Sequence, residues 1–116
     1  MIMVQSTFHL RAESKPKVIA LMTNMVRLCR QEHGCISYEY FAGVTDCNQI
    51  ILLQEWENAD CLQGHYQAEH MDDFMSRLVP YLDKPISTRS YFSQEEGGKI
   101  APAMSNKKPK PEQTVH

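Results

Sequence analysis

Features that mark several specialised classes of protein are scarce in this sequence. No apolar run approaches the ~18 residues that a membrane-spanning helix needs, and the opening MIMVQSTFHL lacks the basic residues that begin a secretory signal. Lys and Arg number 12 against 14 Asp and Glu, for a net charge of -2, whereas a nucleic-acid-binding surface requires a basic surplus. We therefore expect a cytoplasmic protein that binds neither a membrane nor a nucleic acid.

Cysteine is present, but not in the arrangements that bind zinc. The four residues Cys29, Cys35, Cys47 and Cys61 form no C-x-x-C pair and no Cys/His grouping with zinc-like spacing. In a reducing compartment such thiols stay reduced and behave as small apolar side chains. The sequence therefore predicts buried, unpaired cysteines and no metal site.

The composition is that of one small domain followed by a different kind of segment. The chain has 116 residues, of which 42% are hydrophobic and 22% charged, and a chain of this length buries only a modest core. From Glu95 onward Gly, Pro and Lys replace large apolar side chains, which is typical of a flexible segment. We predict a folded domain over 1–94 and a flexible C-terminal tail over 95–116.

Hydrophobic periodicity divides the domain into strands and helices. Apolar residues alternate with period two in the strands and recur at i, i+3 and i+4 in the helices. Ser14 and Asn58 suit helix starts, and Gly34 suits the left-handed position that ends a helix. The predicted elements are strands at 2–10, 35–41, 49–57 and 85–92 and helices at 15–32 and 59–82, the second interrupted between His65 and His70.

The order of these elements, β-α-β-β-α-β, predicts an α+β protein of ferredoxin-like fold. Its helices lie on one face of an antiparallel sheet. Apolar side chains of the strands at 2–10 and 49–57 also point to the other face. We expect a second copy of the chain to cover that face, which makes the protein a homodimer with a dimeric α/β barrel.

Two stretches resemble the antibiotic biosynthesis monooxygenase (ABM) domain family. Residues 32–39, EHGCISYE, resemble that family's E-P-G-C-x-x-Y-x stretch. Residues 54–59, QEWENA, followed by His65 and His70, resemble its E-x-W-x-x-x-x-A-L-x-x-H-x-x-x-x-H stretch. Both occur in the same order and at the same spacing as in the family, and the resemblance covers about residues 2–92.

The resemblance implies a homodimeric α/β barrel with a pocket between the sheet and the helices of each subunit. Relatives include monooxygenases that need no cofactor and oxidise quinols or aromatic polyketides, haem-degrading enzymes, and enzymes that process a quorum-signalling sugar derivative. The haem-degrading branch carries tryptophan where this chain has His65, and asparagine on the first strand, where this chain offers Gln5. The chain departs from the family pattern at His33, for proline, and at Cys61, for alanine.

Oxygenation without a cofactor requires a base that removes a proton from an electron-rich phenol or quinol, in a pocket that excludes water. His65 suits this role because imidazole titrates near neutral pH. Glu69 lies four residues further on and could orient the ring, although the two could also form an ordinary polar pair on a helix surface. His65 and His70 are five residues apart and face different ways on a continuous helix, which argues against a shared metal.

Glu55 interrupts an apolar strand, where a carboxylate needs a partner or a raised pKa. One interpretation places Glu55 in the pocket beside His65 as a second acid or base. The other places it at an exposed strand end, or in a salt bridge across the dimer to Arg89. Trp56 points the opposite way from Glu55 and suits either the core or a surface against which substrate stacks.

Four residues are candidates for substrate binding: Trp56, Tyr38, Tyr66 and His70. A tyrosine hydroxyl can bond a substrate oxygen, but each ring could equally be packed in the core. The leading hypothesis is a cofactor-independent monooxygenase that acts on a quinol or small aromatic substrate. The alternatives are an isomerase or processing enzyme for a small carbonyl signal, and a dimer that binds a ligand without converting it.

Overall fold

The computed structural model describes residues 1–94 and 99–100 of the 116-residue chain. The strands and helices follow one another as the periodicity predicts, and the second helical region is divided in two. The elements are β1 (Ile2–His9), α1 (Lys15–Cys29), β2 (Cys35–Ala42), β3 (Gln49–Trp56), α2 (Ala59–Tyr66), α3 (Glu69–Leu78), β4 (Ser87–Gln94) and β5 (Lys99–Ile100), with short 3-10 turns at Ala12–Ser14 and Val79–Tyr81.

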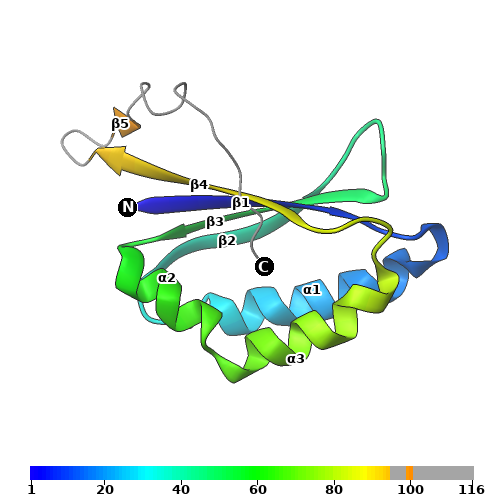
Figure 1. Ribbon diagram of the computed structural model, residues 1–116, viewed down its shortest axis with the longest axis horizontal. Helices are drawn as coiled ribbons and strands as arrows, with labels where there is room; N and C mark the ends of the chain where they lie inside the picture. The colour runs from blue at the N-terminus through cyan, green and yellow to red at the C-terminus, as the bar shows by residue number, and fades with distance from the viewer. Residues whose placement is uncertain (95–98, 101–116) are drawn as a thin grey trace.

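The sheet is antiparallel in the order β2-β3-β1-β4-β5, with β1 between β3 and β4. Figure 1 shows α1, α2 and α3 on one face of this sheet. Alternation along each strand sends every second side chain toward the helices, and in β1 those residues are buried: Ile2, Val4, Ser6 and Phe8. This arrangement confirms the ferredoxin-like α+β fold.

Local residue chemistry explains where the helices begin and end. Asn58 accepts a hydrogen bond from the amide of Cys61 at 2.9 Å and so caps α2. Gly34 adopts φ +80°, the left-handed conformation that was predicted for it. Two predicted ends are too long: α1 stops at Cys29, three residues early, and α3 stops at Leu78, where Pro80 enters a 3-10 turn.

The cysteines are free, as predicted, but they are not all buried. Cys29 and Cys61 lie in the core, Cys35 is half-buried and Cys47 is exposed. Cys47 lies between β2 and β3, outside both strands, so no packed layer covers it. The expectation of buried thiols is therefore correct for two of the four cysteines.

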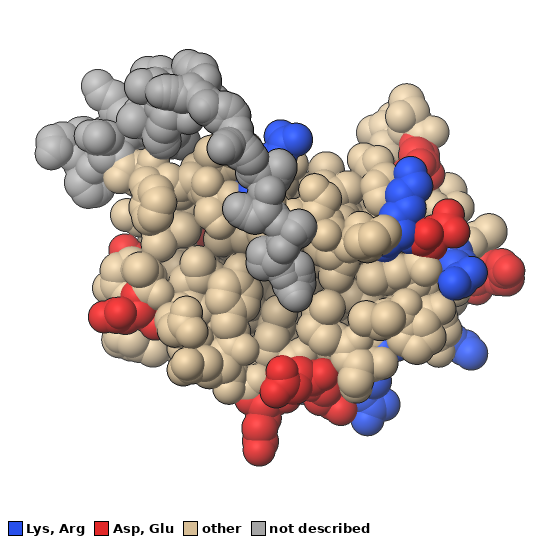
Figure 2. Space-filling model, viewed as in Figure 1, with Lys and Arg blue, Asp and Glu red and all other residues tan. Residues whose placement is uncertain are grey.

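The described residues contain no helix that is long and apolar enough to cross a membrane. On the face drawn in Figure 2, basic side chains are dispersed among acidic ones around the margin. β4 ends at Gln94, and Lys99–Ile100, which fall within the predicted tail, pair with it as β5. Residues 95–98 and 101–116 lie outside the described part of the chain, so the flexible tail stays a prediction.

Candidate functional site

A cavity of about 380 Å³ lies between the helix-facing side of the sheet and α3. This volume is within the range of sites that bind small molecules. Aromatic and aliphatic side chains and two methionines form most of the wall. The lining residues are Ser6, Phe8, Tyr38, Tyr40, Leu52, Gln54, Tyr66, Met71, Asp72, Phe74, Met75, Ile86 and Thr88.

Four of the polar side chains on the cavity wall form two pairs. The hydroxyls of Ser6 and Thr88 lie 3.0 Å apart on neighbouring strands, and those of Tyr38 and Tyr40 lie 3.5 Å apart. Asp72 is the one charged side chain among the described lining residues. The wall therefore suits a flat, largely apolar and uncharged molecule that carries a small number of hydroxyl or carbonyl oxygens.

The two tyrosine hydroxyls stay protonated at neutral pH. Burial raises the pKa of Tyr38, and the neighbouring Tyr40 raises it further. Burial also raises the pKa of Tyr40. Both can therefore donate hydrogen bonds to an oxygen of a bound molecule, including an oxygen that becomes negatively charged.

His65 lies in α2, behind the cavity wall. Its residue is 1% exposed, and its ring packs against those of Trp56, Tyr38 and Tyr66 at centroid distances of 4.8, 5.7 and 5.5 Å. Nδ1 lies 3.0 Å from Oε1 of Glu32. Nε2 is buried and has no hydrogen-bond partner among the described residues, which is unfavourable unless a ligand supplies one.

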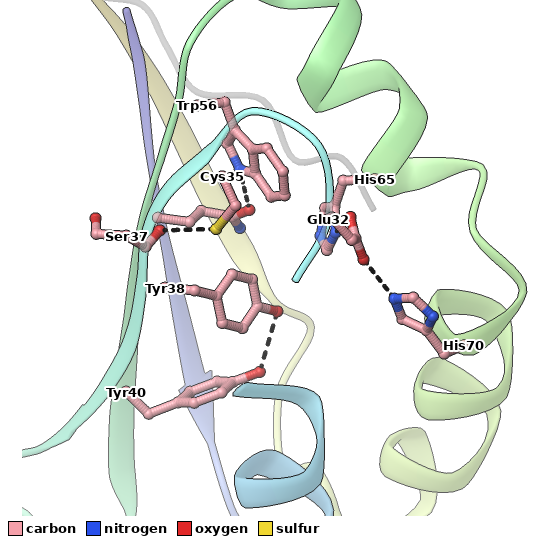
Figure 3. Close-up of polar contacts among 9 residues, drawn as sticks. Glu32, Cys35, Ser37, Tyr38, Tyr40, Trp56, His65 and His70 are labelled. Atoms are coloured by element: carbon pink, nitrogen blue, oxygen red, sulfur yellow. Dashed lines mark hydrogen bonds and ion pairs between the residues drawn. The ribbon is translucent and has the colours of Figure 1, made fainter. Parts of the chain in front are cut away.

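Glu32 joins two histidines that are distant from it in the sequence. Its other carboxylate oxygen, Oε2, contacts Nε2 of His70 in the first turn of α3. Figure 3 shows Glu32 between the two rings, below α2 and beside α3. The amide of Glu32 donates to the carbonyl of Cys29 at 3.0 Å, so the turn at the end of α1 fixes its position. His65, Glu32 and His70 form one hydrogen-bonded cluster.

The surroundings of His65 keep its ring neutral. Burial lowers the pKa of His65, the carboxylate of Glu32 opposes that shift, and His70 adds to it. A neutral imidazole whose Nδ1 donates to Glu32 has a free electron pair on Nε2. His65 is therefore able to accept a proton at neutral pH.

Neither Glu55 nor Glu69 is the hydrogen-bond partner of His65, which is Glu32. Alternation puts Glu55 on the open face of the sheet, because its neighbours Gln54 and Trp56 are both buried on the helix face. There Glu55 accepts a hydrogen bond of 2.8 Å from Ser37. Glu69 does not continue the helix of His65, because α2 ends at Tyr66.

The structure distributes the predicted substrate-binding residues among three environments. Tyr38 and Tyr66 line the cavity. Trp56 is fully buried, packs on His65 and donates through Nε1 to Gln54 at 2.8 Å, so it belongs to the core rather than to the cavity wall. His70 contacts Glu32 and is not part of the lining.

Sequence reasoning missed Glu32, Gln54 and Asp72 as members of the site. Glu32 opens the stretch EHGCISYE that carries the family resemblance, and this was the available signal. Its contact with His65 spans 33 residues and its contact with His70 spans 38. Such long-range pairs cannot be read from periodicity, which reports only on neighbours within one element.

The fold also gathers Cys29, Glu32 and His70, whose ligand-type atoms all lie within 4.8 Å of one another. Burial, followed by the charge of Glu32, raises the pKa of the Cys29 thiol to about 12. The thiol is therefore protonated, and a metal binds the thiolate. Both oxygens of Glu32 are already engaged by histidines. In this structure Glu32 and the two histidines are joined by hydrogen bonds.

Comparisons with known proteins agree on one family. The sequence profile of the antibiotic biosynthesis monooxygenase family matches residues 1–77. The uncharacterized protein sll1783 of Synechocystis sp. is 28% identical over 90 residues, which are 78% of this chain and 61% of that protein. This chain thus matches about three fifths of that relative's length. "Putative monooxygenase YcnE" of Bacillus subtilis is 22% identical over 86 residues, 74% of this chain and 90% of that one.

Solved structures show the same fold. A crystal structure of an antibiotic biosynthesis monooxygenase superposes on the chain with a TM-score of 0.77 at 20% sequence identity. The superposition covers 81% of this chain and 99% of the other.

Proposed function

Because this chain belongs to the antibiotic biosynthesis monooxygenase family, we propose that it oxidises a quinol or similar small aromatic compound with molecular oxygen and without a cofactor. One observation carries the proposal. A buried, neutral histidine, His65, has its Nδ1 held by Glu32 and its Nε2 unpartnered among the described residues, beside a largely apolar cavity. This is the arrangement that deprotonation of a phenol in a dry site requires.

The reaction begins when Nε2 of His65 accepts a proton from a hydroxyl of the quinol. The resulting anion gives one electron to oxygen, and the two radicals combine to form a carbon–oxygen bond. Loss of water from the ring hydroperoxide leaves a hydroxyquinone. One oxygen atom remains on the ring, the other leaves in water, and both hydrogens of that water come from the quinol, so no external reductant is consumed.

Side chains of the cavity wall orient the substrate in this proposal. Tyr38 and Tyr66 separate His65 from the cavity, and Tyr66 is 37% exposed, so its ring can shift when a substrate enters. The substrate hydroxyl then reaches Nε2 between the two rings. Hydrogen bonds from the Tyr38 and Tyr40 hydroxyls stabilise the negative charge that develops on the substrate oxygen.

Oxygen consumption tests the proposed function. We expect the purified protein to take up oxygen with at least one member of a panel of benzoquinols and naphthoquinols, in buffer containing a metal chelator. His65→Gln retains a polar side chain but removes the base, and we expect a loss of about 10²-fold or more in kcat. His33→Gln, at an exposed position, is the matched control and keeps full activity.

The alternatives give different results in the same experiment. An isomerase for a carbonyl compound converts substrate without oxygen uptake. A binding protein retains quinol affinity in both variants and yields no product. Uptake that is unchanged in His65→Gln would remove His65 from the mechanism even if the protein proves to be a monooxygenase.

A further inference from the structure

A single carboxylate links the most buried histidine among the described residues to a partly exposed one. The side chain of His65 is 0% exposed, that of Glu32 15% and that of His70 29%. The contacts between them run from Nδ1 of His65 to Oε1 of Glu32, and from Oε2 of Glu32 to Nε2 of His70. Exposure therefore rises step by step along a continuous series of hydrogen bonds. Figure 3 shows the outer part of the series, where a dashed line joins Glu32 to His70.

We propose that Glu32 and His70 form a proton relay that connects His65 with solvent. The inference rests on the proposed function, in which His65 takes a proton from the substrate. A base enclosed by Trp56, Tyr38 and Tyr66 cannot exchange that proton with water directly. The relay supplies the path, and it makes Glu32 and His70 positioning residues that act through His65.

Each proton in the transfer has a donor and an acceptor among these side chains, the substrate and water. As Nε2 of His65 gains the substrate proton, its Nδ1 proton passes to Oε1 of Glu32. At rest the Nε2 proton of His70 is donated to the Glu32 carboxylate. Once Glu32 is protonated, the partly exposed His70 exchanges its Nε2 proton for one on Nδ1 through water. Its Nε2 then accepts the proton that rotation of the carboxyl group presents, and the Nδ1 proton leaves to water. When the hydroperoxide departs as water it takes the Nε2 proton of His65, and one proton returns from solvent by the reverse path. After each turnover His65, Glu32 and His70 therefore carry the same protons as before it.

Titratable groups from every neighbouring element surround this path. Cys29 from α1 and Cys35 from β2 both interact with Glu32, and burial raises the pKa of each thiol. Burial likewise raises the pKa of Tyr38 and Tyr66. These four groups are protonated at neutral pH, so a proton that leaves His65 has Glu32 as its acceptor.

Proton exchange of the resting protein tests the relay without any turnover. Nitrogen NMR of the wild type should show His65 with its proton on Nδ1 and none on Nε2. That Nδ1 proton should exchange with water quickly for a buried group, and His70→Gln should slow its exchange by at least about tenfold. A variant that merely loosened the packing would speed exchange, so the direction of the change separates a relay from a structural contact.

Turnover supplies the second measurement. In dilute buffer His70→Gln should lower kcat by about tenfold or more with little change in KM, and added imidazole should restore it by accepting the proton from Glu32. Glu32→Gln should lower kcat, and added imidazole should not restore it. The kcat of His33→Gln should be the same with and without imidazole. A resting His65 with its proton on Nε2, or a His70→Gln variant with unchanged or faster exchange, would overturn the relay. Absence of oxygen uptake with every quinol, beside normal relay exchange, would instead reject the proposed function.

Discussion

At the scale of single residues, the site depends on a histidine that the fold has buried in its neutral form. His65 is 1% exposed, although histidine is a polar residue, and Glu32 supplies the hydrogen bond that makes this burial tolerable. The sequence identifies His65 as a candidate base from its residue type and its place in the family motif. The fold decided which carboxylate is its partner: His65 contacts Glu32, not Glu55 or Glu69.

Burial of neutral His65 should make the protein sensitive to acid. Its pKa in the folded state is lowered, whereas an unfolded histidine has a pKa of about 6.5, so the unfolded chain binds more protons between these values. The contribution of neutral His65 to the free energy of unfolding is complete above pH ~6.5 and is lost as the pH falls through the pKa of His65 in the folded protein. We expect the free energy of unfolding, measured with urea, to fall from pH 7.5 to pH 5.0 by more in the wild type than in His65→Gln. Equal falls in the two proteins would contradict this prediction.

At the scale of elements, the turn between α1 and β2 positions the carboxylate. Gly34 has φ +80°, its carbonyl accepts from the amide of Glu57 at 2.9 Å, and a Cβ at this position would lie 2.2 Å from Sγ of Cys61. The turn therefore holds the end of α1 close to the start of α2. Because Glu32 lies two residues before Gly34, this close approach also brings it to His65.

Substitutions at two glycines distinguish the close approach at Gly34 from the effect on stability that any glycine-to-alanine change has. Gly34→Ala places a Cβ in the left-handed region and against Cys61, and should reduce the free energy of unfolding by about 2–4 kcal/mol. Gly64→Ala lies within α2, where a Cβ meets nothing within 4 Å, and should raise it by about 0.5–1 kcal/mol. Chemical denaturation measures both. Similar effects of the two substitutions would show that the close approach at Gly34 is unimportant.

At the scale of the whole molecule, α1, α2 and α3 cover one face of the sheet, and no helix of the described residues covers the other (Figure 1). Alternation places Met3, Ile51 and Leu53 on the open face, and Phe41, paired with Ile51, is 50% exposed there. Glu55 and Arg89 also lie on this face. We propose that a second copy of the chain covers it, with Glu55 and Arg89 close enough to pair across the interface.

A charge on the open face should prevent this association. Leu53→Lys puts an ammonium group where the two sheets would pack, and burying it unpaired is unfavourable by several kcal/mol. We expect sedimentation to show a dimer for the wild type and a monomer for Leu53→Lys. Val79→Lys, at a 55% exposed apolar residue beyond the end of α3, is the control and should remain dimeric. A monomeric wild type at micromolar concentrations would contradict the proposed dimer.

The amino-acid sequence by itself determined the type and order of the elements from β1 to β4 and therefore the fold, because period-two and helical periodicity are properties of neighbouring residues. It also determined the interruption of the second helical region and the left-handed turn at Gly34. It did not determine the ends of α1 and α3 or the short β5. Only the tertiary structure decided which charged group meets His65, because Glu32, His65 and His70 come from three elements whose approach depends on packing. The same holds for Glu55: alternation relative to Trp56 is visible in the sequence, but which face the helices cover is settled when the sheet packs.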